Sequence, residues 1–157
     1  MTRIDHLDNP DAPAATSVVP SANVVVVNDE GQILLIRRTD NDNWAVPGGA
    51  MDLGESIADC AVRETREESG MDVEITAMTG IYTNPRHLIE YTSNGEVRQE
   101  FSVVFSATPV GGEIATSSES SEVRWVSPDE LDRFAMHPSM RTRIEHALEQ
   151  RQTAYIC

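Results

Sequence analysis

The chain has 157 residues, a length that suits one domain able to bury a hydrophobic core of its own. Its 26 acidic and 12 basic residues give a formal net charge of -14 at pH 7, which argues against a nucleic-acid surface and against electrostatic attachment to an anionic membrane. No apolar run approaches the roughly 18 residues of a membrane helix and no charged, apolar leader opens the chain, so we expect a cytoplasmic protein.

Residues 1–17 predict a flexible N-terminal arm. They include Asp8, Asn9, Pro10 and Pro13, which favour turns and irregular backbone over a core element. The sequence leaves open whether this arm is disordered, lies on the surface or contacts a partner subunit.

Two continuous apolar runs, residues 24–27 and 33–36, flank the turn residues 28–31. This pattern predicts a β-hairpin whose strands are buried on both faces. Arg37 and Arg38 follow the second run. Because adjacent strand residues point to opposite faces, one of these arginines is a candidate substrate-binding residue that meets a phosphate, and the alternative is a pair of solvated charges.

A helix is predicted over residues 57–69. Ser56 and Asp59 have the spacing of a capping box, and Gly70 is the residue type that ends a helix in the left-handed conformation. A stripe of small residues faces the core at i, i+3, i+4 and i+7. The stripe consists of Ala58, Ala61, Val62 and Thr65.

Glu64, Glu67 and Glu68 form an anionic strip on the same helix. Three close carboxylates repel one another unless they take up protons or share a cation. All-oxygen ligands favour a hard divalent ion, Mg²⁺ ahead of Mn²⁺ or Ca²⁺. Arg63 can pair with Glu67 at i+4 and hold it in one rotamer. On the helix alone, a solvated acidic face is the alternative.

The remaining pattern predicts a strand over residues 73–81 and a second hairpin, 87–92 with 97–107, joined by an Asn-Gly turn. Arg86 and Arg98 are further candidate substrate-binding residues, because they bring positive charge to this otherwise acidic or apolar region. A polar loop over residues 111–121 precedes a short strand over residues 123–126.

Two helices are predicted near the C-terminus. The first covers residues 128–134, with Ser127 as its cap and Pro128 in its first turn. The second covers residues 138–152 and carries no recognisable site.

The spacing of polar and glycine residues around the first helix resembles the signature of the Nudix hydrolase family. Seven such positions in the right register over 23 residues make a highly specific match, which an apolar residue closes. These positions are Gly49, Glu55, Arg63, Glu64, Glu67, Glu68 and Gly70, followed by Met71. Thr65 departs from the pattern, because the family usually has a bulky aliphatic residue there.

The resemblance implies an α/β fold, an α/β/α sandwich with a mixed β-sheet, and it divides the chain into an arm (1–17), a Nudix domain (18–152) and a tail (153–157). It also implies a metal site, Mg²⁺ or alternatively Mn²⁺, formed by Glu64, Glu67, Glu68 and the Gly49 carbonyl. Candidate catalytic residues are Glu67, Glu68, Glu119 and Arg63. Glu119 completes the metal site or acts as general base, and Glu122 is the second choice for this role. Glu55 is expected to orient the loop.

The implied reaction is hydrolysis of the diphosphate in a nucleoside diphosphate linked to another moiety. Pro85 lies about fifteen residues beyond the signature, where proteins that resemble ADP-ribose pyrophosphatases often carry proline. This resemblance favours ADP-ribose or a sugar nucleotide as substrate. A MutT-like nucleoside triphosphate pyrophosphohydrolase is the first alternative and a non-catalytic nucleotide-sensing module the second. The expected partner is thus a nucleotide-type small molecule, and a homodimer is common among proteins of this kind.

Overall fold

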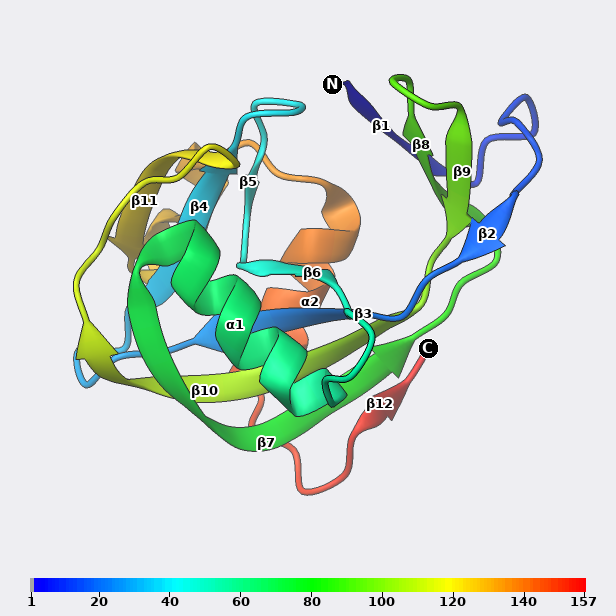
Figure 1. The fold of residues 1–157 in the computed structure, drawn as a ribbon. Coiled ribbons are helices and arrows are strands. Elements are labelled where there is room, and N and C mark those ends of the chain that lie inside the picture. The colour runs from blue at the N-terminus through cyan, green and yellow to red at the C-terminus, as the bar shows by residue number, and fades with distance from the viewer. Residues whose placement is uncertain (1) are drawn as a thin grey trace.

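The computed structural model describes residues 2–157 (Figure 1). Its strands are β1 (Arg3–Leu7), β2 (Ser17–Val18), β3 (Ser21–Val26), β4 (Ile33–Arg38), β5 (Trp44–Ala45), β6 (Gly48–Ala50), β7 (Met71–Tyr82), β8 (His87–Tyr91), β9 (Glu96–Gln99), β10 (Ser102–Gly112), β11 (Ser120–Val126) and β12 (Tyr155–Ile156). Its helices are α1 (Ile57–Ser69), the 3₁₀-helix η1 (Pro128–Arg133) and α2 (Pro138–Leu148).

A mixed five-stranded sheet, ordered β12-β7-β10-β3-β6, forms the centre of the molecule. Strand β3 runs parallel to β10. On its other side, β10 pairs antiparallel with β7, and β-bulges interrupt the regular pairing of these two strands. Val24 and Val26 of β3 belong to the apolar cluster that includes Cys60 and Ala61 of α1, whereas Val25 belongs to the cluster that includes residues of α2. The predicted α/β/α sandwich is therefore confirmed, with α1 and α2 on opposite faces of the sheet (Figure 1).

The first predicted hairpin exists only at its closed end. The apolar parts of β3 and β4, Val24–Val26 and Ile33–Ile36, are buried as expected, but the two strands share only the bridge between Val27 and Ile33 before they diverge. Strand β4 belongs to a second sheet, β11-β4-β5, while β3 pairs with β10 and β6. Continuous apolar runs show that a strand is buried but do not specify its neighbour, and this is why the prediction was wrong on pairing.

A third sheet, β1-β8-β9-β2, includes much of the N-terminal segment. The structure differs here from the expected flexible arm, because Arg3–Leu7 pair antiparallel with β8 and Ser17–Val18 pair with β9. The second hairpin has its turn where predicted, but its return strand breaks after Gln99. One half, β9, stays in this small sheet, and the other half, β10, enters the central sheet.

Helix α1 has the predicted bounds. Both bonds of the capping box are present, and Gly70 adopts φ 79°. Thr65, the residue that departs from the family pattern, is fully buried, and its hydroxyl donates to the carbonyl of Ala61 at 2.8 Å. A buried hydroxyl with a partner costs little, so the departure leaves the packing of α1 intact.

The C-terminal region differs from the prediction in three respects. Residues 128–133 form a 3₁₀-helix, and the Ser127 side chain makes no capping hydrogen bond. Helix α2 ends at Leu148, four residues before the predicted end at residue 152. Tyr155 and Ile156 then form β12, which pairs parallel with β7 and places the C-terminal segment at the sheet edge.

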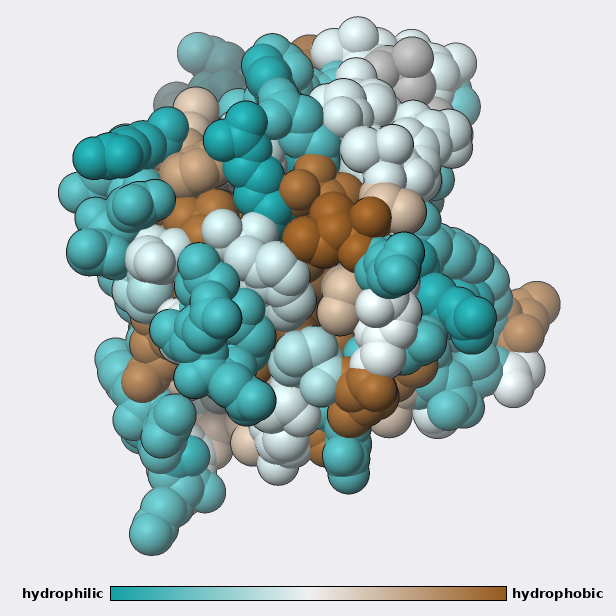
Figure 2. Space-filling model, turned by 90° about the vertical axis from the view of Figure 1, so that its left-hand side faces the viewer, coloured by the Kyte–Doolittle hydropathy of each residue, from teal (hydrophilic) through white to brown (hydrophobic). Residues whose placement is uncertain are grey.

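No helix within residues 2–157 is long and apolar enough to cross a membrane. The face of the molecule shown in Figure 2 is mostly hydrophilic and carries only small, separate hydrophobic patches. This surface agrees with the excess of acidic residues in the sequence.

Candidate functional site

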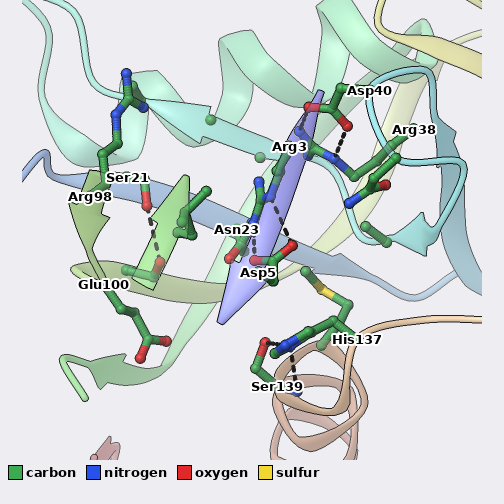
Figure 3. A pocket seen from close by; sticks show the side chains of 18 of the residues that line it. Arg3, Asp5, Ser21, Asn23, Arg38, Asp40, Arg98, Glu100, His137 and Ser139 are labelled. Carbon is green, nitrogen blue, oxygen red and sulfur yellow. Dashed lines mark hydrogen bonds and ion pairs between the residues drawn. The ribbon is translucent and has the colours of Figure 1, made fainter. Parts of the chain in front are cut away.

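A polar cavity of about 610 Å³ lies where the three sheets and α1 meet. Strand β3 contributes Asn23, β6 contributes Gly49, and β9 contributes Arg98. Strand β1 also forms part of the wall, and Figure 3 shows Arg3 and Asp5 of this strand beside Arg38 and Asp40. The cavity is large enough for a small molecule of nucleotide size.

Three carboxylates gather at one side of this cavity. Oxygens of Glu64, Glu68 and Glu119 all lie within 4.8 Å of one another. Glu64 and Glu68 are buried, whereas Glu119 is exposed. One oxygen of Glu68, Oε2, is buried without a hydrogen-bond partner among residues 2–157. A buried carboxylate oxygen that lacks a donor is a ready ligand for a cation.

Local structure explains how these residues meet. Glu64 and Glu68 stand one helical turn apart on α1, so their side chains lie on one face. Glu119 belongs to the loop before β11, and hydrogen bonds on both sides of Glu119 attach this segment to the rest of the site. The Ser120 hydroxyl donates to the main-chain oxygen of Glu68, and the Thr39 amide donates to the carbonyl of Glu119 at 3.1 Å.

Burial and mutual repulsion raise the pKa values of the two helix carboxylates. Burial raises the pKa of Glu68 well above its ordinary value, Arg38 opposes the change, and the charges of Glu64 and Glu119 add to it. Burial likewise raises the pKa of Glu64, against the hydrogen bond from Arg63. The three carboxylates are thus held close together without enough positive charge to compensate them.

Arg63 donates hydrogen bonds to three carboxylates near the site. Its guanidinium donates to Glu55 at 2.9 and 2.7 Å, to Glu64 at 2.9 Å and to Glu67 at 3.2 Å. Glu55 also accepts from the Asp52 amide, so it orients the loop, and the hydrogen bonds from Arg63 lower its pKa to about 2. Glu67 is 59% exposed and does not belong to the group of three carboxylates.

Gly49 lies directly against the Glu64 carboxylate. A Cβ atom at Gly49 would stand 2.5 Å from the carboxyl carbon of Glu64. The carbonyl of Gly49, an expected metal ligand, faces the Cys60 thiol, with 3.5 Å between Sγ and O. Only glycine therefore leaves room for Glu64 in its present position.

Gly49→Ala is expected to weaken metal binding by about tenfold while the protein still folds, because the added methyl group displaces only the end of a flexible side chain. Gly111→Ala is the matched control, since its new Cβ would meet Asp72 at an ordinary 3.6 Å. Titration of both variants with Mn²⁺ measures the effect. Equal affinities for Mn²⁺ in the two variants would show that metal binding does not depend on the position of Glu64.

The four candidate substrate-binding arginines separate into two groups. Arg38 and Arg98 line the cavity, where they pair with Asp40 and Glu96. Arg37 instead pairs with Asp42 and Glu122 and does not line the cavity. Arg86 also lies outside it and is paired with Asp8. The structure therefore leaves Arg38 and Arg98 as the stronger candidates.

Several cavity residues were not predicted from the sequence. Arg3 and Asp5 reach the cavity on β1, His137 caps α2, and Arg143 pairs with both Glu100 and Asn23. Among these residues, the sequence gives a signal only for Arg143, which is an isolated basic residue on a buried helix face. It stands one residue before Ile144 and three after Met140, and both of these are buried. A charged residue in such a stripe indicates a buried partner.

The residues present fit a hard divalent cation. They supply oxygen ligands alone, one of them buried and unpartnered, and a glycine that allows Glu64 to approach. Glu64, Glu68 and Glu119 are the residues that would hold it.

Comparisons with known proteins point to one family. The family model described as NUDIX domain matches residues 18–147. A "MutT-like protein" of Streptomyces ambofaciens is 42% identical over 107 residues, which are 68% of this chain and 62% of that protein. An "ADP-ribose pyrophosphatase" of Methanocaldococcus jannaschii is 28% identical over 113 residues, which are 70% of this chain and 63% of that protein.

The fold is also found among solved structures. The structure of an ADP-ribose pyrophosphatase from Streptococcus suis superposes with a TM-score of 0.68 at 23% identity and covers 89% of this chain and 98% of that one. The two curated relatives above are each matched over less than two thirds of their own length.

Proposed function

Because the chain belongs to the Nudix hydrolase family, we propose that it is a divalent-metal-dependent pyrophosphohydrolase that cleaves the diphosphate of a nucleoside diphosphate linked to another moiety. The observation that carries this proposal is the group of Glu64, Glu68 and Glu119, which stands beside a polar cavity of about 610 Å³. Mg²⁺ is the proposed ion, and Mn²⁺ would satisfy the same oxygen ligands.

The proposed roles of the residues follow from burial and contacts. Glu64 and Glu68 are the buried carboxylates and hold the ion, and Arg63 positions Glu64 through the 2.9 Å hydrogen bond. When bound, Mg²⁺ offsets the charge of the diphosphate and activates water for attack on phosphorus. Glu119 completes the ligands of the ion and, because it is exposed to the cavity, is also the proposed general base. Glu67 and Glu68 are the alternative bases, and Glu67 also remains a candidate ligand.

The bond changes balance without a further reactant. The water oxygen forms a bond to one phosphorus, the bond from that phosphorus to the bridging oxygen breaks, and the water proton passes to the base. The products are a nucleoside monophosphate and the phosphorylated second moiety. Arg38 and Arg98, on the cavity wall, are proposed to contact the phosphates or the ribose as the bond breaks.

The charges of the cavity support a diphosphate rather than a triphosphate. Each arginine that lines it already pairs with a carboxylate. These pairs are Arg3 with Asp5, Arg38 with Asp40, Arg98 with Glu96 and Arg143 with Glu100. Since little positive charge is left over, we propose ADP-ribose or a related sugar nucleotide as the substrate class.

A MutT-like nucleoside triphosphate pyrophosphohydrolase remains the second candidate. The observation in its favour is the 42% identity to the "MutT-like protein" of Streptomyces ambofaciens, which exceeds the 28% identity to the archaeal "ADP-ribose pyrophosphatase". The two activities differ in their products, and this difference makes them separable by experiment.

Product analysis with a panel of ADP-ribose, sugar nucleotides and nucleoside triphosphates tests the proposal, in Mg²⁺ and in EDTA. We expect a nucleoside monophosphate and a sugar phosphate from the first two classes, with no turnover in EDTA. Release of inorganic pyrophosphate from a triphosphate would instead establish the second candidate. Turnover that persists in EDTA, or no turnover of any compound, would contradict a metal-dependent hydrolase.

A further inference from the structure

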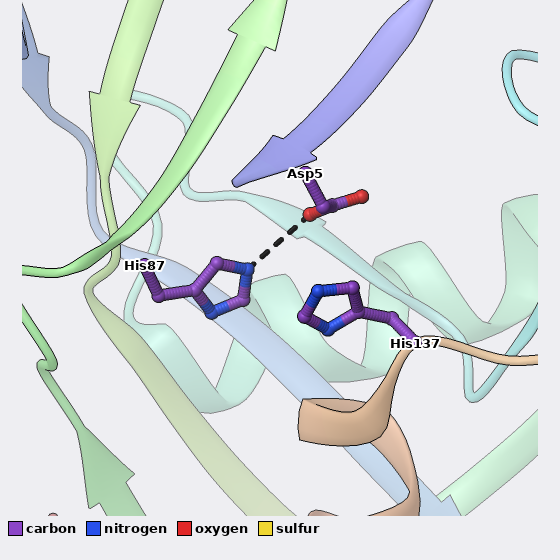
Figure 4. A group of neighbouring side chains, drawn as sticks. All are labelled: Asp5, His87 and His137. Carbon is purple, nitrogen blue, oxygen red and sulfur yellow. Dashed lines mark hydrogen bonds and ion pairs between the residues drawn. The ribbon is translucent and has the colours of Figure 1, made fainter. Parts of the chain in front are cut away.

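A second cluster of potential metal ligands lies in the same cavity, outside the acidic group. It consists of Asp5 from β1, His87 at the start of β8 and His137 at the N-terminus of α2. One ligand atom from each residue lies within 4.8 Å of the other two. Figure 4 shows that both imidazole rings turn an edge toward the Asp5 carboxylate.

Neighbouring residues hold all three side chains in place. Nδ1 of His87 is 3.5 Å from Oε2 of Glu100, and Nδ1 of His137 is 2.7 Å from the Ser139 hydroxyl. Arg3 donates to both oxygens of Asp5, at 3.1 and 3.0 Å. Nδ1 of His137 also accepts from the Ser139 amide at 3.2 Å, so in the metal-free protein this ring carries its proton on Nε2. A metal ion on Nε2 requires the other tautomer, in which Nδ1–H donates to the Ser139 hydroxyl, and histidines that bind metals commonly donate their second ring N–H in this way.

One pair of ligand atoms is spaced as two ligands of one metal ion are. Oδ1 of Asp5 and Nε2 of His87 stand 3.3 Å apart. Two ligands on a tetrahedral zinc ion, each about 2.0–2.1 Å from it, are separated by about 3.4 Å. Nε2 of His137 makes no hydrogen bond within residues 2–157 that would compete for this position.

We propose that Asp5, His87 and His137 form a second metal site, for a borderline transition ion such as Zn²⁺, with its fourth position open to the cavity. Two imidazoles and one carboxylate suit such an ion better than Mg²⁺, which prefers oxygen ligands alone. The site ties three segments together that are far apart in the chain, and one of them, β1, lies outside the matched NUDIX region of residues 18–147.

Without metal, the same residues form a charged network. His87 stands between Asp5 and Glu100, with Arg3, Arg143 and His137 around them. Zn²⁺ must displace the proton that this network holds on the inner nitrogen of His87. Binding therefore competes with protonation, and we expect tighter Zn²⁺ binding at pH 8 than at pH 6.

The test uses the full chain and Zn²⁺ in excess Mg²⁺, which occupies the acidic group. Because the sequence has four histidines, ¹H–¹⁵N spectra of their side chains resolve each ring. We expect one equivalent of Zn²⁺ to shift the Nε2 signals of His87 and His137 and to leave those of His6 and His146 unchanged. Signals of His87 and His137 that do not respond to Zn²⁺ would overturn the proposal.

Variants give an independent measurement by equilibrium dialysis. His137→Asn removes the ring but keeps an oxygen that can accept from the Ser139 amide and cap α2. We expect it to weaken Zn²⁺ binding by at least about tenfold. His6→Asn is the matched control, because His6 lies on β1 next to Asp5 and pairs with Glu90 instead. Equal binding by both variants, or loss of Zn²⁺ in Glu68→Gln alone, would place the ion elsewhere.

Discussion

Glu68→Gln is expected to lower kcat of the Mg²⁺-dependent reaction by about a hundredfold or more and, in contrast, to raise the melting temperature of the metal-free protein. The loss follows because the variant removes the charge of the most buried carboxylate in the group, which is 3% exposed. The gain follows because the same charge lies close to Glu64 and Glu119 and has an oxygen without a donor. Steady-state kinetics and thermal melts in EDTA measure the two effects.

Glu74→Gln is the control for a change of net charge, since Glu74 is exposed on β7 and lies outside the cavity. It should leave both quantities unchanged. A Glu68→Gln variant whose kcat is undiminished would contradict the proposed mechanism. Lower metal-free stability in that variant would show instead that the carboxylates do not repel one another in the folded protein.

Arg143→Met is expected to lower the free energy of unfolding by about 3–5 kcal/mol, the cost of leaving a buried charge without its partner. Arg143 is 5% exposed, and its guanidinium donates to Glu100 and Asn23 between α2 and the central sheet. Its removal leaves Glu100, also 5% exposed, with the His87 imidazole as its remaining basic neighbour. Urea unfolding of the metal-free protein gives the change in stability.

The double variant Arg143→Met, Glu100→Gln separates the lost pair from the lost packing. Because it removes the unpaired charge, it should recover a large part of the stability lost in Arg143→Met. Arg141→Met is the surface control, since Arg141 pairs with Asp132 and Glu145 at the surface. This variant should change the free energy of unfolding little. Equal losses in Arg143→Met and Arg141→Met would show that the buried pair contributes nothing particular.

Helix α1 was predictable because its signals are local. Ser56, Asp59 and Gly70 define its ends within a few residues of sequence, and both capping bonds are present. The sequence grouped Glu64, Glu67 and Glu68 together, but the structure separates them. On a helix, Glu67 and Glu68 lie on opposite sides of Glu64, by about 60° and 40°. Glu68 falls on the side of the buried Thr65, whereas Glu67 turns toward Arg63.

The residues of the cavity wall could not be predicted, because strand pairing between segments far apart in the chain brings them together. Strand β1 pairs with β8, more than 80 residues along the chain, and its polar composition resembles that of a disordered segment. The small strand β12 likewise depends on the exposed edge of β7. Composition indicates whether a segment is apolar enough to lie in the core. A short strand at a sheet edge need not be apolar, so composition does not reveal it.

Direct titration with Mn²⁺, followed by electron paramagnetic resonance, tests the central claim that Glu64, Glu68 and Glu119 hold the catalytic ion. Wild-type protein and Glu74→Gln should bind Mn²⁺ with equal affinity and release it to excess Mg²⁺. Glu68→Gln should bind at least about tenfold more weakly. Mn²⁺ binding that is as tight in Glu68→Gln as in the wild type would contradict the claim.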